Sequence, residues 1–236
     1  MVQPFEERMH IEGGDLIRQV VMGANDGIVS IFALLAGVAG ANQPASIILL
    51  TLLAASIAGA LSMAVGEFVS SKSERNYFEN EILKERLEIK LVPHIEREEL
   101  KLIYLKKGLS GEILDKVVDN IIKNEDQWVK EMVIDELGVA EIEQEGELKG
   151  TLVIFISFIL GAIFPTLPYI LFQALPGMTI FWIATGLTFF GLFFIGAMKK
   201  YITGVNWIKS GLELLLAGTF AFGVSFIIGQ FLGVSV

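Results

Sequence analysis

Long apolar stretches alternate with charged ones along this chain, in a pattern that predicts five membrane-spanning helices. Residues 27–66 carry no charge over 40 positions and are interrupted only by the turn signal Asn42-Gln43-Pro44. Because a spanning helix needs about 20 residues, the apolar run before this turn is too short alone, and the first span must begin near Arg18. The second runs from about Ala45 to Phe68. Three further spans are expected, at about 150–172, 178–198 and 210–234.

The second span continues into a polar stretch without any helix-stop signal. No Pro or Gly lies between Glu67 and Val92, and Pro93 is the first residue able to end the helix. We therefore expect one helix about 70 Å long, roughly twice what a membrane requires. At 100° per residue, one line along it gathers a thioether and five carboxylates. These residues are Met63, Glu67, Glu74, Glu81, Glu85 and Glu88.

Residues 70–148 are typical of a water-exposed helical domain. Shorter helices are expected at about 96–107, 112–123 and 125–137, followed by the linker AEIEQEGEL that leads back to the membrane. No strand alternation is evident. The predicted fold class is all-α, with five transmembrane helices and a cytosolic helical domain inserted between the second and third. The expected domain limits are 1–69, 70–148 and 149–236.

Composition agrees with a membrane protein whose charge is concentrated in the inserted domain. Only 19% of residues are charged and the mean hydropathy is +0.61, whereas soluble domains carry about a quarter charged residues. Residues 72–149 hold 20 of the 27 Asp and Glu residues. This acidic excess argues against nucleic acid as a partner and favours cations. The absence of cysteine excludes thiolate metal sites, and the N-terminus shows no signal-peptide pattern.

The distribution of lysines predicts the orientation in the membrane. The loop KKYITGVNWIK (199–209) carries three lysines, whereas the connection QALPGMT carries no charge, so the positive-inside rule places the former in the cytosol. The N-terminus and residues 70–148 are then cytosolic. Two glycine pairs, Gly23/Gly27 and Gly229/Gly233, have the spacing that lets membrane helices approach closely.

Two carboxylate pairs flank Pro93 and are candidates for a metal site. Glu85/Glu88 and Glu96/Glu99 each have i,i+3 spacing, which places each pair on one helix face. A chain reversal at Pro93 can bring the pairs together, and four close carboxylates repel one another unless a cation neutralises them. The alternative is a solvated acidic face.

Met132 and Glu136 form an i,i+4 pair on the last helix of the same domain. Beside a carboxylate cluster, a thioether ligand favours a transition metal over Ca²⁺ or Mg²⁺. The alternative for Met132 is a core residue.

Asp26 is the most informative single residue, because the length of the first span forces it into the membrane. It lies eight residues, about 12 Å, inside Arg18. An ionisable group there is costly unless it faces a polar path or a partner. A buried carboxyl satisfied by Asn25 or by backbone is the alternative. Met63 has comparable depth on the second span and Glu67 lies one turn closer to the cytosol; the alternatives are a packing or lipid-facing methionine and a carboxylate at the headgroup level.

Motifs of known enzymes are absent from the sequence. His10 and His94 lack metal-ligand spacing, and no GxSxG, P-loop or dinucleotide fingerprint occurs. A di-iron oxidase would require Glu-x-x-His pairs, which are also absent. We therefore expect a protein that is not an enzyme and has no resident cofactor.

Two segments, GANDGIVSIFALLAGVAGA and GALSMAVGEFVSSKSE, resemble the vacuolar iron transporter family, and the layout agrees over nearly the whole chain. The resemblance implies a homodimer that exports Fe²⁺ or Mn²⁺ from the cytosol in exchange for protons. The metal path would follow the dimer axis between the first and second spans, and the acidic domain would gather metal for it. Other divalent metals are further candidates for the cargo.

The resemblance also assigns individual residues. By position, Asp26 and Met63 match the membrane ligands of the family. The ligands of its acidic domain are matched by Glu85, Glu88, Glu96, Glu99, Met132 and Glu136. Where better-known members have a Glu two turns before the methionine of the second span, this chain has Ala55. Our hypothesis is that Glu67 partly substitutes for it at the cytosolic mouth.

The sequence thus predicts a divalent transition-metal transporter in a lipid bilayer. The membrane would be the cell membrane in a prokaryote and the vacuolar membrane in a eukaryote. The alternative is a membrane-bound metal sensor or scaffold that transports nothing.

Overall fold

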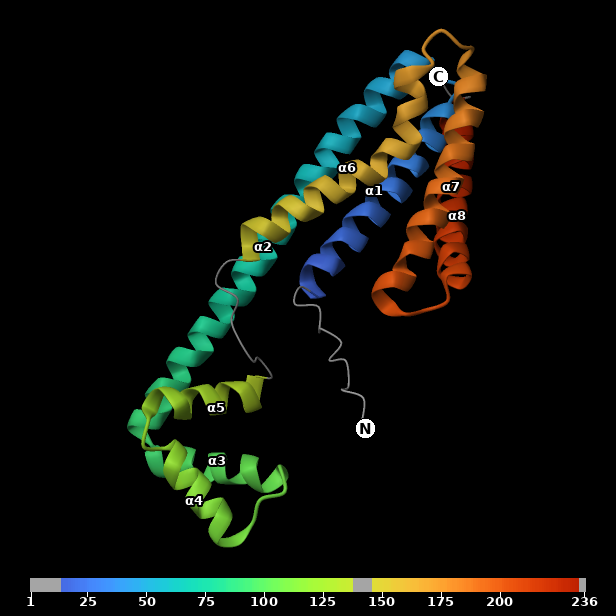
Figure 1. The fold of residues 1–236 in the computed structure, drawn as a ribbon. Helices are drawn as coiled ribbons and strands as arrows, with labels where there is room; N and C mark the ends of the chain where they lie inside the picture. The colour runs from blue at the N-terminus through green and yellow to red at the C-terminus, as the bar shows by residue number, and fades with distance from the viewer. Residues whose placement is uncertain (1–13, 138–145, 234–236) are drawn as a thin grey trace, which may run out of the picture. The chain divides into compact units, whose positions relative to one another are not determined.

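The computed structural model describes residues 14–137 and 146–233, with side chains described except at 14–15, 136–137, 146–147 and 201–203. His10 and most of the linker before the third span lie outside these ranges. The described residues form eight helices and no strand, which confirms the all-α prediction (Figure 1). The helices are α1 (Gly14–Gly40), α2 (Ala45–Leu91), α3 (Pro93–Lys106), α4 (Gly111–Ile121), α5 (Glu125–Leu137), α6 (Gly146–Leu171), α7 (Gly177–Thr203) and α8 (Trp207–Gly233).

Five of these helices are long and apolar enough to cross a membrane, as the hydrophobic pattern predicts. They are α1, α2, α6, α7 and α8. The observed ends differ from the expected ones by a few residues for local reasons. Helix α7 continues past Met198 to Thr203, because the first residue able to end it is Gly204. Gly204 adopts a left-handed φ of 70°, and its N–H donates to the carbonyl of Lys200.

Helix α2 is continuous over 47 residues, as expected from its lack of Pro and Gly after Gly66. It begins after a turn in which Asn42 takes a positive φ of 57°. Helix α3 begins at Pro93 rather than at Glu96. The backbone N–H groups of a helix's first turn have no hydrogen-bond partner within the helix, so proline, which has no N–H, is well suited to the first position.

The chain divides into two compact units, which are described separately. The membrane unit consists of residues 1–68 and 147–236, and the acidic unit of residues 69–146. Helix α2 contributes residues to both units.

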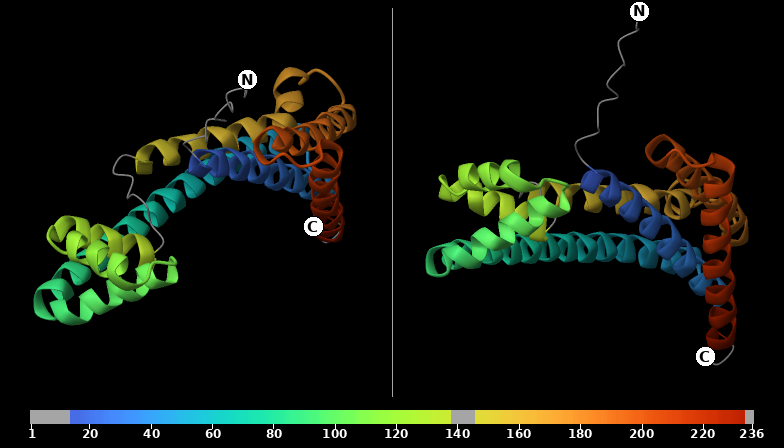
Figure 2. Two further views of the ribbon diagram at one scale, coloured as in Figure 1. Left: turned by 60° about the horizontal axis from the view of Figure 1, so that its bottom comes forward. Right: turned by 90° about the horizontal axis from the view of Figure 1, so that it is seen from below.

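Glycines allow the helices of the membrane unit to approach closely. A Cβ at Gly27 of α1 would lie 2.1 Å from the carbonyl oxygen of Phe158 in α6, and a Cβ at Gly23 would lie 2.7 Å from that of Ile154. A Cβ at Gly229 of α8 would lie 2.0 Å from the carbonyl oxygen of Gly37 in α1. Both glycine pairs singled out in the sequence therefore lie at helix crossings. Figures 1 and 2 show α7 and α8 side by side in this unit.

The membrane unit has an apolar core centred on α1. Ile28, Phe32 and Leu35 are fully buried there, together with Phe158 of α6 and Leu192 of α7. These residues recur at helical spacing along α1, so one face of that helix is fixed against its neighbours.

The acidic unit has its own core, built from one face of each of its helices. Leu100 of α3, Val118 of α4 and Met132 of α5 are fully buried, and Ile89 from the end of α2 packs with them. The unit therefore presents its remaining polar faces to its surroundings.

Candidate functional site

Asp26 lies near the middle of α1, and its side chain is exposed on the membrane unit. The interpretation as a carboxyl buried within its own chain is therefore wrong. One turn on, the Ser30 hydroxyl donates a hydrogen bond to the backbone carbonyl of Asp26 rather than to its carboxylate. An exposed carboxylate in an apolar span needs a polar path or a partner to cover it.

Met63 differs from Asp26 in its surroundings. Its side chain is half-buried on α2 and packs against the apolar core of the membrane unit. Ala55, where the resemblance noted in the sequence implies a Glu in better-known members, is also half-buried against this core. The thioether of Met63 and the carboxylate of Glu67 one turn later are thus the candidate metal ligands on the spanning part of α2.

Glu67 is held by two side chains from α1. Gln19 Nε2 donates a hydrogen bond of 2.6 Å to Glu67 Oε1, and an Arg18 guanidinium nitrogen lies 3.8 Å from the same oxygen. The Glu67 side chain is 9% exposed, and Gln19 is buried. Glu67 is therefore not open to solvent, because a cation and an amide donor from another helix cover one of its oxygens.

The four paired glutamates of the acidic unit fall into two classes. Glu85 and Glu96, one from each pair, are buried at 7% and 4% exposure, whereas Glu88 and Glu99 are exposed. Met132 is fully buried in the same unit. Carboxylates are rarely this buried unless they are paired, hydrogen-bonded or bound to a cation, so Glu85 and Glu96 stay candidates for the ligand role.

The structure does not show these residues gathered into a finished metal cage. Among the described residues, no group of three or more His, Asp or Glu side chains is placed to hold a metal ion. Glu136 belongs to α5, but its side chain lies outside the described residues. The ligand set drawn from the sequence therefore stays a prediction.

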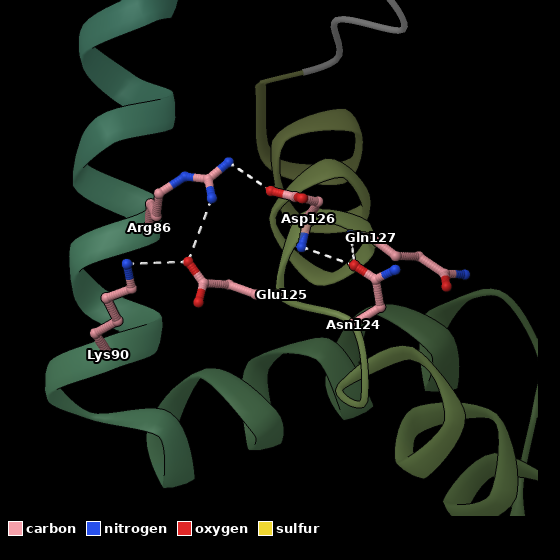
Figure 3. A network of polar contacts seen from close by, with 6 residues as sticks. All are labelled: Arg86, Lys90, Asn124, Glu125, Asp126 and Gln127. Atoms are coloured by element: carbon pink, nitrogen blue, oxygen red, sulfur yellow. Dashed lines mark hydrogen bonds and ion pairs between the residues drawn. The ribbon is translucent and has the colours of Figure 1, made fainter.

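Other carboxylates of the acidic unit are neutralised by basic residues of neighbouring helices. Figure 3 shows Arg86 of α2 contacting both Glu125 and Asp126 at the start of α5, with distances of 3.3 and 2.8 Å. Lys90 Nζ lies 3.1 Å from the same Glu125 oxygen. Asn124 caps α5, since its side-chain oxygen accepts hydrogen bonds from the backbone N–H groups of Asp126 and Gln127.

Similar pairs join α3 to α4. Arg97 lies 2.8 Å from Asp119, and Lys101 lies 2.6 Å from Asp115. The hydrogen bond from Lys101 lowers the pKa of Asp115 below its ordinary value. On the α5 side, burial and then a 2.8 Å hydrogen bond to Glu131 raise the pKa of Tyr104 to about 12. The ion pairs among the described residues involve neither Glu88 nor Glu99.

Gln19 was missed by reasoning from the sequence, and Arg18 served to mark where the first span begins and how deep Asp26 lies. A lone glutamine near the start of a span carries no signal of its own. The contact with Glu67 joins residues 48 positions apart and depends on how α1 crosses α2.

Comparisons with known proteins agree with this architecture. The sequence model of the VIT family matches residues 17–230. The chain belongs to the VIT family. It is 31% identical to vacuolar iron transporter 1 of Arabidopsis thaliana, over 94% of this chain and 88% of that protein. It is 32% identical to vacuolar iron transporter 1 of Oryza sativa subsp. japonica, over 90% and 83%.

A relative from a third organism gives the same result. The vacuolar iron transporter of Toxoplasma gondii is 31% identical, over 94% of this chain and 77% of that protein. The resemblance noted in the sequence is thereby confirmed. Together with the five apolar helices, membership of this family identifies the chain as an integral membrane protein.

Proposed function

We propose that this protein transports a divalent transition metal, Fe²⁺ first and Mn²⁺ second, out of the cytosol in exchange for protons. The single observation that carries the proposal is an exposed carboxylate, Asp26, near the middle of an apolar spanning helix of a VIT-family chain. The relatives named vacuolar iron transporters support iron as the cargo. An intramembrane carboxylate is retained at a cost in stability, so it needs a functional reason.

The donors along the proposed route suit such a cargo. The acidic unit, through Glu85, Glu88, Glu96, Glu99, Met132 and Glu136, would gather the ion. Glu67 at the mouth would pass it to Met63 and Asp26 within the membrane. Carboxylates alone suit hard cations, and each thioether shifts the preference toward a transition metal. Because carboxylate ligands must be deprotonated, protons arriving from the outer, acidic side would release the ion at Asp26.

A homodimer is part of the proposal, and two features of the single chain support it. Asp26 is exposed on the membrane unit, where lipid would otherwise be its neighbour. On the acidic unit, Leu83, Leu87 and Leu91 form an i,i+4,i+8 row on α2 and are 58%, 57% and 76% exposed. Three uncovered leucines on one face of a polar helix are typical of a protein interface. A second copy would cover both surfaces.

The orientation follows from the lysines. Lys199 and Lys200 lie near the end of α7, and Lys209 lies near the start of α8. By the positive-inside rule, the connection between these helices, the N-terminus and the acidic unit would be in the cytosol, so that gathered metal would approach from the cytosol. The host membrane would be the cell membrane or the vacuolar membrane, according to the organism.

Flux into proteoliposomes tests the function. The full-length protein is reconstituted, a pH gradient is imposed, and uptake of Fe²⁺ and Mn²⁺ is measured singly and in competition. We expect uptake that depends on the gradient and is abolished by Asp26→Ala, with the elution volume and melting temperature in detergent unchanged. Glu112→Gln, which changes an exposed carboxylate on α4 outside the spanning helices, is the control and should transport normally.

Two results would contradict the proposal. Undiminished flux in Asp26→Ala would remove the residue on which it rests. Metal binding by a wild-type protein that produces no flux would favour the sensor or scaffold instead.

A further inference from the structure

Glu67 links two helices of the membrane unit at a defined place. On α2 it lies one turn beyond Met63, and its partner Gln19 lies two turns before Asp26 on α1. The contact therefore joins the helices that carry the two proposed membrane ligands. It lies between the proposed entry to the route and both ligands.

The contact competes with a metal ion for the same atom. Glu67 Oε1 accepts the 2.6 Å hydrogen bond from Gln19 Nε2 and has the Arg18 guanidinium 3.8 Å away. A divalent cation at that oxygen would compete with the amide donor for the oxygen's lone pairs and would be repelled by the guanidinium. Both contacts from α1 therefore oppose the binding of a cation to Glu67 through this oxygen.

The amide that holds Glu67 is itself only partly satisfied. Gln19 is 6% exposed, and within the described part of the chain its Oε1 accepts no hydrogen bond. A buried acceptor without a donor is costly, so the arrangement gives up part of the stability that the hydrogen bond provides. A contact of this kind can be exchanged for another partner more readily than a fully satisfied one.

A glycine on a third helix, α6, provides the space that the Gln19 side chain occupies. A Cβ at Gly150 of α6 would lie 2.4 Å from Gln19 Nε2 and 2.9 Å from its Cδ and Oε1. Glycine at this position allows the amide to lie between α6 and Glu67. The methyl group of alanine would push the amide out of its place.

We propose that Gln19 and Arg18 form a latch on Glu67 that opposes its binding of an entering divalent cation, and that Gly150 makes room for the latch. Gln19 and Arg18 are then positioning residues that set how readily metal enters. The inference rests on the proposed function. It adds that Gln19 and Arg18 control the entry of metal without having to bind the metal themselves.

The test measures the kinetics of Mn²⁺ uptake by proteoliposomes that contain the full-length protein. These kinetics distinguish a contact that controls metal entry from one that only supports the fold. Gln19→Ala frees Glu67 from its donor, so we expect KM for Mn²⁺ to fall about three- to tenfold with kcat unchanged within about twofold. Gly150→Ala should lower KM in the same direction. Glu67→Gln should raise KM, and adding Gln19→Ala to it should change KM no further. Gly186→Ala, where a Cβ meets nothing within 4 Å, is the control.

A KM that stays the same or rises in Gln19→Ala, with kcat reduced, would show a structural contact and overturn the latch. If the wild-type protein produces no flux, the proposed function fails instead. The latch is then judged by calorimetric Mn²⁺ binding to the same full-length variants in detergent. Tighter binding in Gln19→Ala and Gly150→Ala supports it, and equal or weaker binding overturns it.

Discussion

Gly27 of α1 and Phe158 of α6 are in direct backbone contact, since a Cβ at Gly27 would lie 2.1 Å from the Phe158 carbonyl oxygen. Gly161 of α6 faces α1 in the same way, and its Cβ would lie 2.3 Å from the carbonyl oxygen of Ala24. These contacts fix the segment of α1 on either side of Asp26. The position of that carboxylate therefore depends on small residues that have no chemistry of their own.

Gly27→Ala should destabilise the membrane unit, because the added methyl group meets backbone that cannot rotate away. We expect a loss of about 1–3 kcal/mol, as for overpacked cores, and a lower melting temperature in detergent followed by tryptophan fluorescence. Gly186→Ala adds the same methyl group in open space on α7 and should melt like the wild type. Equal melting of both variants would mean that α1 and α6 are farther apart than described.

Replacing both buried carboxylates of the acidic unit should remove most of the increase in stability that bound metal gives the protein. Glu85→Gln with Glu96→Gln removes two buried charges at nearly constant volume, so the metal-free protein should melt at the same temperature or higher. Metal at about 100 times its Kd stabilises a binding protein by about 2.7 kcal/mol, and the double variant should lose most of this gain.

Differential scanning calorimetry of the full-length protein, with and without Mn²⁺, measures both effects. Glu112→Gln is the matched control, because Glu112 is an exposed carboxylate on α4 that pairs with Lys116 in its own helix. A metal-induced shift that survives in the double variant would exclude Glu85 and Glu96 as ligands.

Tyr104 should make the acidic unit sensitive to strongly alkaline pH. Its neutral phenol donates to Glu131, and its pKa is raised from 10.0 to about 12 by burial and by that hydrogen bond. A group whose folded pKa is raised contributes stability below its unfolded pKa and loses it as pH rises through the folded value. The contribution of Tyr104 is thus complete below about pH 10 and lost by about pH 12.

Tyr104→Phe should remove this dependence and about 0.5–1.5 kcal/mol of stability at neutral pH. Absorbance at 295 nm during an alkaline titration of the full-length protein follows the phenol, with Tyr77→Phe as the exposed comparison. The raised pKa of Tyr104 is wrong if the absorbance change that disappears in Tyr104→Phe has its midpoint near pH 10.

The helices could be predicted because their signals are local. Apolar length sets the five spans, and the lack of Pro and Gly after Gly66 sets the continuity of α2. Helix α3 was expected to begin three residues too late, because a proline that ends one helix can also begin the next.

The site was only partly accessible from the sequence. Spacing identified Glu85 and Glu96 as candidates, but their burial depends on the packing of α3, α4 and α5. The exposure of Asp26 and the contact of Glu67 with Gln19 depend on helix crossings, which periodicity along one helix cannot reveal.

The ion pairs of the acidic unit have a consequence for its counterions. Carboxylates on α4 and α5 are already matched by basic groups on α2, on α3 or just after it; they are Asp115, Asp119, Glu125, Asp126 and Asp135. Carboxylates that are paired in this way attract few cations from solution. The cations that gather around the domain therefore concentrate near the carboxylates outside these ion pairs, which include Glu88 and Glu99. Monovalent ions in the surrounding solution would screen that smaller set. A dilute divalent ion would then have to exchange with potassium over a short stretch of surface, rather than over the whole domain.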